Sequence, residues 1–457
     1  MKKLLFTTAL IVAMSASSAN ATNADIAKEL ESLKAQLKAQ QQLIDKLEKR
    51  LNSEVAKQTE AIAKIKPAAG GDVKGDVKIT MSPSPKIEST DGKHSFQPFG
   101  RIHTDVAVFD DDKNDHPDGA TFRRVRLGFK GKVDNDINYK AELDFGNKGS
   151  SDSVSFKDVY IEYTGLKHAN IKVGNFRPAY GLEELTSSNY ITFIERSLPT
   201  GSFATGEIIG LQTNGSGDNY SWVIGAHNDK STTKSSDDEA KSVVARVTYA
   251  PLAEADKSFH LGLSQVYRVP DSANDTVSFD TKAENSIQSL ESAETGSVTG
   301  VDSIYLTGLE AAGVYGALSV QGEYFYNIID RETASDVNLG GWYAQASYFL
   351  TGESRPYKVS NGTFGRVKPT SPFSLKEGGW GAWEVAARYS VIDLNDNNIQ
   401  GGAVRDITLG VNWYLNNHTR LMANYIMSDT DSVTPSGANV SANDDPNLLL
   451  LRAAIDF

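Results

Sequence analysis

Residues 406–416 read DITLGVNWYLN, and every second side chain in this stretch is large and apolar. Ile407, Leu409, Val411 and Trp413 share one parity, and the residues between them are smaller or more polar. Successive side chains of a β-strand point to opposite faces, so this pattern predicts a strand with one apolar and one polar face. What the apolar face contacts decides the fold.

The same period of two recurs from about residue 95 to the end of the chain. It is clear in INYKAELDF (137–145), where Lys140, Glu142 and Asp144 alternate with apolar residues, and in VRLGFKGK (125–132). Ionised side chains therefore lie in mid-strand on the polar face. We predict sixteen strands, at 96–109, 120–133, 136–146, 153–164, 168–176, 207–214, 220–228, 241–250, 258–268, 301–311, 314–327, 338–350, 380–391, 406–416, 419–429 and 447–457.

Two architectures explain half-apolar strands. A soluble β-sandwich turns the apolar faces inward, whereas a membrane barrel turns them to lipid and lines a wet lumen with the polar faces. Aromatic side chains near the strand ends favour the barrel, because they form girdles at the two membrane interfaces. These are Tyr324, Tyr326, Trp342, Tyr348, Trp383, Tyr389, Trp413, Tyr425 and Phe457. We predict an all-β, 16-stranded antiparallel transmembrane β-barrel around an aqueous channel rather than a packed core.

The stretch GLEELTSSNYITFIERSLP, residues 181–199, breaks the alternation. It falls in a long connection between the fifth and sixth predicted strands, and its apolar residues would be unfavourable in water. We expect this loop to fold into the barrel and narrow the pore. Its Glu183, Glu184, Glu195 and Arg196 leave a hydrolase open as an alternative, although carboxylate pairs alone are weak evidence of catalysis.

The N-terminal 94 residues have a different composition. Two lysines, the apolar run LLFTTALIVAM and an A-x-A site predict a secretory signal peptide at 1–21. A heptad-like seam at 22–66 then predicts an α-helical coiled coil, and residues 67–94 are expected to be a linker before the barrel at 95–457. A single amphipathic helix is the alternative to the coiled coil. The seam residues are Ile26, Leu30, Leu33, Leu37, Gln40, Ile44, Leu47 and Leu51.

The composition argues against several other functions. The chain contains no cysteine, which excludes disulfides, thiolate metal sites and cysteine nucleophiles. Its seven histidines show no metal-ligand spacing, so we expect neither a metal nor another cofactor. A net charge of -12 with no basic stripe argues against a nucleic-acid partner.

Seven stretches of the chain resemble the phosphate-selective porin O and P family, trimeric outer-membrane porins of Gram-negative bacteria. The resemblance extends in order over nearly all of 95–457, includes the terminal Phe457, and also fits the N-terminal coiled coil. The stretches are FGRIHTDVAVFD, FRRVRLGFKG, FKDVYIEYTG, GLEELTSSNYITFIERSLP, GWYAQASYFLTGESRPY, GAWEVAARYS and GVNWYLN. It implies a homotrimer in outer-membrane lipid of a Gram-negative bacterium, a non-enzymatic channel, and small anionic solutes as partners.

The resemblance also implies an anion site in the constriction. It assigns an arginine pair to Arg123 and Arg124, an acid to Asp158, and loop residues to Ser187 and Arg196. Strand parity places Arg126 on the lumen face beside Arg124. Arg123 shares its parity with Val125, so either it lies at the rim or a bulge precedes Val125.

The sequence departs from the family's phosphate-binding residues in two places and matches them in a third. The family's loop lysine is replaced by Glu184, and its external arginine ladder is missing from 269–300, where Lys282 is the only base. The family's periplasmic basic residues are matched by Lys74, Lys78, Arg355, Lys358, Arg366 and Lys368. We therefore expect a passive channel for small anions, with phosphate and polyphosphate as the candidate solutes. The alternatives are a general porin for small polar solutes and a structural protein that tethers the envelope.

Overall fold

The computed structural model describes residues 77–81, 83–146, 154–228, 240–271, 275–287, 291–431 and 443–457, and seven single positions nearer the N-terminus. The chain divides into two compact units, Met1–Lys74 and Gly75–Phe457. The signal peptide, the seam residues and Lys74 lie outside the described residues. Among the described residues, no helix is long and apolar enough to cross a membrane. The single positions, all helical and exposed, are Glu31, Lys34, Lys38, Gln42, Lys46, Lys49 and Ser53.

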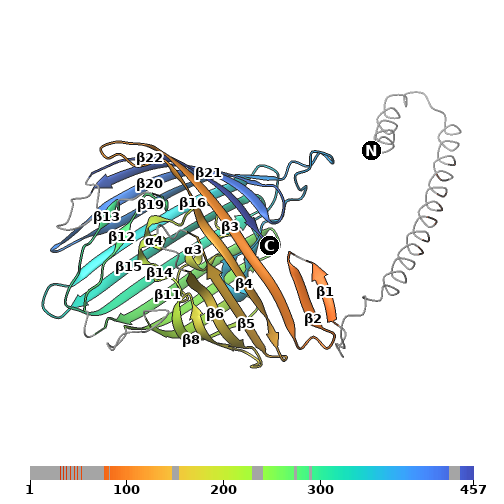
Figure 1. Cartoon of the computed structure of the whole chain (residues 1–457), viewed down its shortest axis with the longest axis horizontal. Coiled ribbons are helices and arrows are strands. Elements are labelled where there is room, and N and C mark those ends of the chain that lie inside the picture. Colours follow the sequence, from red (N-terminus) through yellow and green to blue (C-terminus); the bar gives the residue numbers. More distant parts are fainter. Residues whose placement is uncertain are drawn as a thin grey trace. The chain divides into compact units, whose positions relative to one another are not determined.

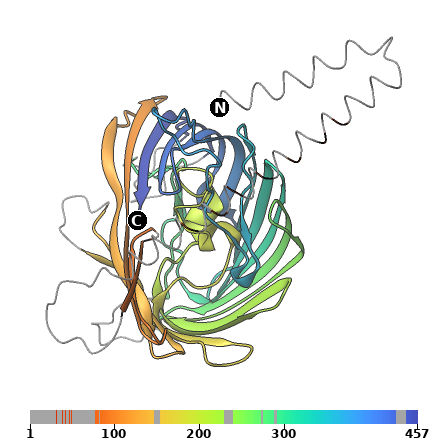
Figure 2. The same cartoon turned by 90° about the vertical axis from the view of Figure 1, so that its right-hand side faces the viewer.

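Within the described part of the second unit, sixteen antiparallel strands form a closed wall (Figure 1, Figure 2). The last strand pairs with the first, from Asn447 opposite Asp110 to Asp456 opposite Arg101. Closure leaves no unpaired edge in the wall, as lipid requires. The wall strands are β3 (Ser95–Asp110), β4 (Gly119–Val133), β5 (Ile137–Asp144), β6 (Ser155–Tyr163), β7 (Asn170–Phe176), β8 (Ile208–Ser216), β9 (Tyr220–Asn228), β10 (Lys241–Ala253), β11 (Lys257–Val269), β14 (Val301–Tyr315), β15 (Leu318–Arg331), β16 (Val337–Phe349), β19 (Ala382–Asp396), β20 (Ile399–Tyr414), β21 (Thr419–Asp431) and β22 (Asn447–Asp456).

The two faces of the wall follow the alternation in the sequence. In β20, Ile407 and Leu409 are 45% and 48% exposed on the outside, whereas Asp406 and Thr408 are at most 1% exposed inside. The aromatic residues near the strand ends also point outward, and Trp383 stacks on Trp413 with ring centroids 5.0 Å apart. The predicted barrel and its sixteen strands are therefore confirmed.

The turn between β14 and β15 lies further along the chain than predicted. The sequence places it near residue 312, but pairing continues to Tyr315 opposite Leu318. Gly316 provides the turn with a φ of 56°, which glycine adopts without steric strain. The unbroken apolar run around Gly313 gives no local signal for the end of the strand.

Part of the predicted linker is folded. β1 (Val77–Met81) and β2 (Pro85–Ser89) form an antiparallel hairpin inside the range 67–94. β2 continues onto the wall, because Ile87 lies opposite Phe96 at the start of β3. The range is therefore not entirely an unstructured connection.

Three connections contribute buried side chains to the inside of the barrel and reduce its lumen. The inner loop, residues 177–207, contains α3 (Leu182–Leu185) and α4 (Leu198–Phe203), and Figure 2 shows it within the ring of strands. The long external loop, 270–300, contains β12 (Asp280–Thr281) and β13 (Ala293–Glu294). The turn-side segment, 350–381, contains β17 (Tyr357–Lys358), η2 (Val359–Asn361) and β18 (Thr363–Phe364).

One part of the lumen is a dry core rather than the open channel that the strand number alone predicts. Leu198 and Phe203 of the inner loop pack with Val277 of the long external loop. They also contact inward-facing residues of the wall, such as Phe325 and Leu339, which are at most 1% exposed. An open cavity remains on the other side of the lumen, lined by residues of β3 to β10.

Candidate pore constriction

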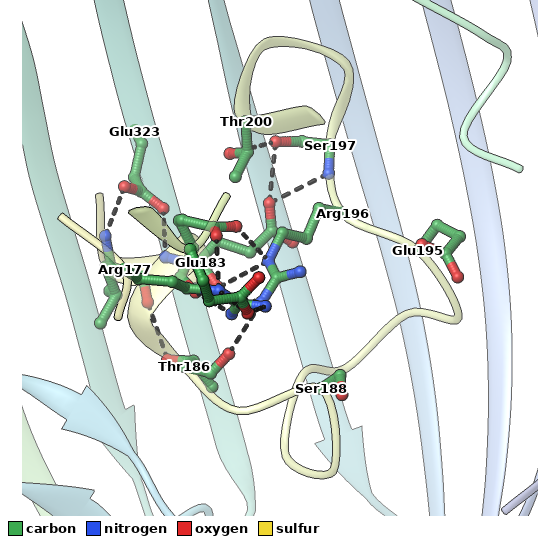
Figure 3. Close-up of polar contacts among 12 residues, drawn as sticks. Arg177, Glu183, Thr186, Ser188, Glu195, Arg196, Ser197, Thr200 and Glu323 are labelled. Carbon is green, nitrogen blue, oxygen red and sulfur yellow. Dashed lines mark hydrogen bonds and ion pairs between the residues drawn. The ribbon is translucent and has the colours of Figure 1, made fainter. Parts of the chain in front are cut away.

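Carboxylate groups hold the inner loop in place, and one of them comes from strand β15 of the barrel wall (Figure 3). Gly181 has a φ of 72°, and after it the backbone N–H groups of Leu182 and Glu183 donate to Glu323 of β15 at 2.6 and 2.8 Å. Glu183 in turn accepts hydrogen bonds from the backbone and side chain of Ser197, at 3.0 and 2.8 Å. These contacts close the loop on itself and fix its position in the lumen.

Glu184 and Arg196 face each other inside the loop. Arg196 Nε lies 2.9 Å from a Glu184 carboxylate oxygen, and the same guanidinium donates to the carbonyl oxygens of Glu183, Glu184 and Thr186. Arg177 approaches Glu184 from the other side at 3.0 Å. Glu184 is only 4% exposed. Its negative charge is therefore balanced by two arginines and withdrawn from the channel.

The arginine pair owes its position to a β-bulge. His103 lies opposite Arg124 and Thr104 lies opposite Phe122, which leaves Arg123 as an extra residue in β4. The bulge lets Phe122 point outward, 61% exposed, while Arg123 and Arg124 both reach a lumen partner. Of the two explanations for the parity of Arg123, the bulge is the one observed.

The lumen partner of the arginine pair is Glu195, which lies between α3 and α4 in the inner loop (Figure 3). Its carboxylate accepts from Arg123 at 2.9 and 3.1 Å, from Arg124 at 3.4 Å, and from Arg452 of β22 at 2.6 Å. Burial alone would raise the pKa of Glu195, but Arg123 and the other two arginines outweigh it and hold the pKa well below its usual value. Glu195 thus stays ionised and offsets part of the positive charge that the sequence predicts for the constriction.

A second bulge lies two strands away. Ala141 lies opposite Val159 and Leu143 opposite Phe156, so the consecutive residues Lys157 and Asp158 face Glu142 together. Lys157 pairs with Glu207 of the inner loop at 3.0 Å. Asp158 pairs with Lys140 of β5 at 2.5 Å. The predicted acid is therefore held by a wall lysine and not by the arginine pair.

The predicted site residues fall into two groups. Arg126, Asp158 and Ser187 line one cavity of about 320 Å³ between the wall and the inner loop. Arg126 lies 2.8 Å from Asp144, and Ser187 accepts from Arg101 at 3.4 Å. Arg123, Arg124, Glu184 and Arg196 do not line this cavity; they brace the inner loop.

Several charged residues of the cavity are missing from the predicted site. Lys140 and Glu142 could have been found, because their strand parity already places them on the lumen face. Arg177 and Glu207 are the first and last residues of the inner loop and pair with each other at 3.0 Å, a contact that the sequence does not signal. The charged residues that line the cavity without having been predicted are Arg101, Lys140, Glu142, Lys172, Arg177, Glu207 and Arg246.

The basic residues predicted for the periplasmic side have different environments. Lys78, Lys358 and Lys368 are exposed. Arg355 is 5% exposed, donates to Gln321 at 2.8 Å, and lies 3.7 Å above the ring of Phe364. Arg366 forms an ion pair with Asp456. Arg355 and Arg366 are thus engaged in packing or pairing, and the Nζ atom of Lys358 lies 5.8 Å from the centre of the Tyr190 ring.

One arginine of the barrel wall links the long external loop to the inner loop through ion pairs. Arg388 of β19 pairs with Glu284 of the external loop and, at 3.1 Å, with Glu183 of the inner loop. Lys282 pairs with Glu291 of its own loop at 3.2 Å. In the part of the chain that the structure describes, no cluster of three side chains suitable for a metal ion is present.

Comparison with known proteins places this geometry in a family. The model of the family described as "Phosphate-selective porin O and P" matches residues 96–457. Porin O of Pseudomonas aeruginosa is 32% identical over 418 residues, which cover 84% of this chain and 93% of that protein. An uncharacterised protein of Caulobacter vibrioides is 29% identical over 390 residues, 82% of this chain and 76% of that protein.

Solved structures share the fold at low sequence identity. An anion-selective porin from Comamonas acidovorans superposes with a TM-score of 0.53 and 14% identity, covering 80% of this chain and all of that one. The outer-membrane protein OmpT of Vibrio cholerae, solved in a trimer form, gives 0.51 and 11%, with coverage of 80% and 100%. The chain therefore belongs to the phosphate-selective porin O and P family and is an outer-membrane porin of a Gram-negative bacterium.

Proposed function

We propose that this porin is a passive diffusion channel for small anions, with phosphate among them. The observation that carries this proposal is the charge of the channel cavity, whose lining has six basic and three acidic residues. A net positive lining inside a low-dielectric wall attracts anions and repels cations. The basic residues are Arg101, Arg126, Lys140, Lys172, Arg177 and Arg246, and the acidic residues are Glu142, Asp158 and Glu207.

Neutral polar groups support passage of hydrated or partly dehydrated anions. Ser187, Ser188, Gln212 and Asn214 line the same cavity. Hydroxyl and amide groups can donate hydrogen bonds to an anion and replace part of its hydration shell. Because Glu184 is enclosed by Arg177 and Arg196, the exchange from the family's lysine does not present a free carboxylate to the solute.

A general porin with weak charge preference is the second candidate, and Glu195 is the observation that favours it. Its carboxylate occupies the space between Arg123, Arg124 and Arg452, where a permeating phosphate would otherwise meet the arginines. The arginine pair then contributes less to selectivity than the resemblance implies. Anion preference would depend on the cavity along β3 to β10 instead.

A channel is a better explanation of the inner-loop carboxylates than a hydrolase. Glu183 is bonded to Ser197 and Arg388, and Glu195 to three arginines. Each carboxylate is committed to holding the loop, which argues against a free general base. We therefore propose that the protein is not an enzyme.

Assembly and export complete the proposal. We propose a homotrimer in outer-membrane lipid, supported by the trimer form of the structurally similar OmpT and by the predicted coiled coil at 22–66. The predicted signal peptide at 1–21 would direct export. The exposed Lys78, Lys358 and Lys368 would add positive charge near the periplasmic mouth.

Reversal potentials in a potassium chloride gradient across planar bilayers test the anion preference. Wild-type channels should prefer chloride, and Arg126→Gln should shift the potential towards cations because Arg126 lines the cavity. Lys282→Gln is the matched control, since Lys282 is paired with Glu291 away from the cavity. A wild-type preference for potassium, or an equal shift in both variants, would reject the proposal.

A further inference from the structure

Aromatic and basic side chains share one patch of the channel cavity. Lys172, Gly174 and Phe176 occupy successive lumen-facing positions of β7, and Tyr160 of β6 lies opposite Gly174. The Nζ atom of Lys172 lies 4.6 Å from the centre of the Tyr160 ring. The Phe176 ring meets the Tyr160 ring edge to face, with centroids 6.3 Å apart. We call Tyr160, Lys172 and Phe176 the aromatic–lysine patch.

Gly174 makes room for this arrangement. Its φ is 138°, and a Cβ atom there would lie 2.2 Å from the carbonyl oxygen of Val159 and 2.6 Å from the Cα atom of Tyr160. Neither backbone atom can move aside without disturbing the strand pair. A residue with a side chain is therefore excluded at 174, and the Tyr160 ring has Lys172 and Phe176 as neighbours along β7.

The patch forms part of the same cavity as the basic residues of the wall. Tyr160, Lys172 and Phe176 line it together with Arg126 and Lys140. On the adjoining strand, Gln212 lies directly opposite Lys172 and offers an amide. The cavity volume of about 320 Å³ lies at the lower end of the range for pockets that bind small organic molecules, roughly 300–1,000 Å³.

We propose that this cavity is a subsite for organic anions that carry a carboxylate or phosphate group on an aromatic ring. The proposal rests on the anion channel proposed above and narrows its solute class. The anionic group would bind Lys172 and the Gln212 amide, while the ring packs on Tyr160. Inorganic phosphate has no apolar surface with which to use the aromatic faces, so it gains only the electrostatic part of the interaction.

Pairs of anions that differ by an aromatic ring distinguish the contribution of the ring to binding from that of the charged group. Benzoate is compared with acetate, and phenyl phosphate with inorganic phosphate, as inhibitors of chloride current through wild-type channels in planar bilayers. Within each pair, the anion with the ring should inhibit at a concentration about two- to tenfold lower, as expected for one aromatic contact.

Three variants locate the effect. Tyr160→Leu should reduce the concentration ratio within each pair towards one, and Lys172→Gln should weaken inhibition by both members of each pair. Phe99→Leu is the matched control, because Phe99 also lies near two lysines, at 5.6 and 5.2 Å, but does not line the cavity. In Phe99→Leu, the ratio of inhibitory concentrations within each pair should equal that of the wild type. Chloride conductance of each variant shows that the barrel has folded.

Equal inhibition within each pair in the wild type would overturn the subsite. A loss of the ratio in Phe99→Leu to the same extent as in Tyr160→Leu would also overturn it. Reversal potentials on the same membranes separate this failure from failure of the proposed function. Anion preference without discrimination within the pairs rejects only the subsite, whereas cation preference rejects the anion channel itself.

Discussion

Glu195 controls how much positive charge the constriction presents. It accepts hydrogen bonds from Arg123 and Arg452 and lies 3.4 Å from Arg124, so three cations share one carboxylate. Arg452 has a second partner, Asp105, at 2.6 Å. Removing the charge of Glu195 would leave Arg123 and Arg124 without an anionic partner among the contacts described, and a permeating anion could take its place.

We therefore expect Glu195→Gln to increase the preference for anions, with a change of roughly several-fold in the permeability ratio, because charges in a narrow pore are poorly screened. The melting temperature should fall, since buried arginines lose a partner. Reversal potentials and thermal melts measure both effects. Glu332→Gln is the control: that residue is exposed in an external loop, where salt screens its charge. An unchanged reversal potential in Glu195→Gln would show that solutes bypass this cluster.

The residues of the site show where sequence reasoning reaches its limit. The lumen positions of Arg124, Arg126 and Lys140 follow from strand parity alone. The partnership of Glu195 with Arg452 does not, because these residues are brought together only when β22 closes on β3. Likewise, the resemblance shows that Glu184 replaces the family's loop lysine. Only the fold shows that Arg177 and Arg196 enclose its carboxylate.

Among the elements, β4 shows how one extra residue builds a site. The bulge at Arg123 places two consecutive arginines in the lumen and still leaves Phe122 and Val125 on the outer side. Bulges re-aim side chains in this way at functional sites of sheets. From the sequence FRRVRLGF alone, a bulge and a position at the rim were equally compatible with the pattern.

Two deletions test the bulge. Removing Arg123 restores regular alternation and keeps Phe122 outside and Arg124 inside, so the barrel should fold with a similar yield. If Val125 is removed instead, Arg124 directly precedes Arg126, and a regular strand with Arg126 inside points Arg124 towards lipid. An arginine near the middle of the bilayer lowers the free energy of unfolding by about 2–4 kcal/mol. Heat-modifiable electrophoretic mobility of refolded protein measures the folded fraction. Equal yields from the two deletions would contradict this register.

One aspartate, Asp444, ties two of the external loops together. Asp444 accepts hydrogen bonds from the backbone N–H groups of Lys113 and Asn114, at 2.8 and 3.2 Å, and contacts His116 at 2.7 Å. Burial alone would raise the pKa of Asp444, but the Lys113 amide and His116 outweigh it and lower the pKa. A lowered pKa means that this contact stabilises the loops above the ordinary aspartate pKa of about 3.9 and is lost as pH falls through the lowered value.

We expect the Lys113 and Asn114 amides to lose hydrogen-exchange protection on acidification below about pH 4, after correction for the intrinsic rate. Asp444→Asn should remove most of that protection already at pH 7. Asp445→Asn is the control, because Asp445 accepts from the amide of Thr430 instead. Protection at the two amides that does not change with pH, or that falls equally in both variants, would exclude Asp444 as the group responsible.

For the whole molecule, the alternation of strands such as β20 was sufficient to predict the barrel but not what fills it. Phe325 and Leu339 face inward and are dry, because α4 and the long external loop cover them. Phe325 and Ile329 interrupt the polar lumen face of β15, but nothing local indicates which distant loop will pack there. The same limit applies to the hairpin of β1 and β2 inside the predicted linker.

We expect the barrel to fold without the N-terminal region. Its wall closes through β22 and β3, and the last residue, Phe457, exchanges backbone hydrogen bonds with Gly100 at 2.9 and 3.1 Å. The described wall needs no residue before Ser95 for this closure. Deleting 22–66 after the signal peptide should therefore leave the barrel folded, with wild-type conductance and heat-modifiable mobility.

Loss of the predicted coiled coil should instead weaken the trimer, so the deletion variant should dissociate at a lower temperature than the intact protein. Native mass spectrometry of detergent-solubilised protein measures the species present. Deletion of the terminal Phe457 is the opposite case, because it removes the two backbone hydrogen bonds next to the closing strand pair and should lower the folded yield. Only monomers from the intact protein would reject the trimer, and an unfolded 22–66 deletion would reject the independence of the wall.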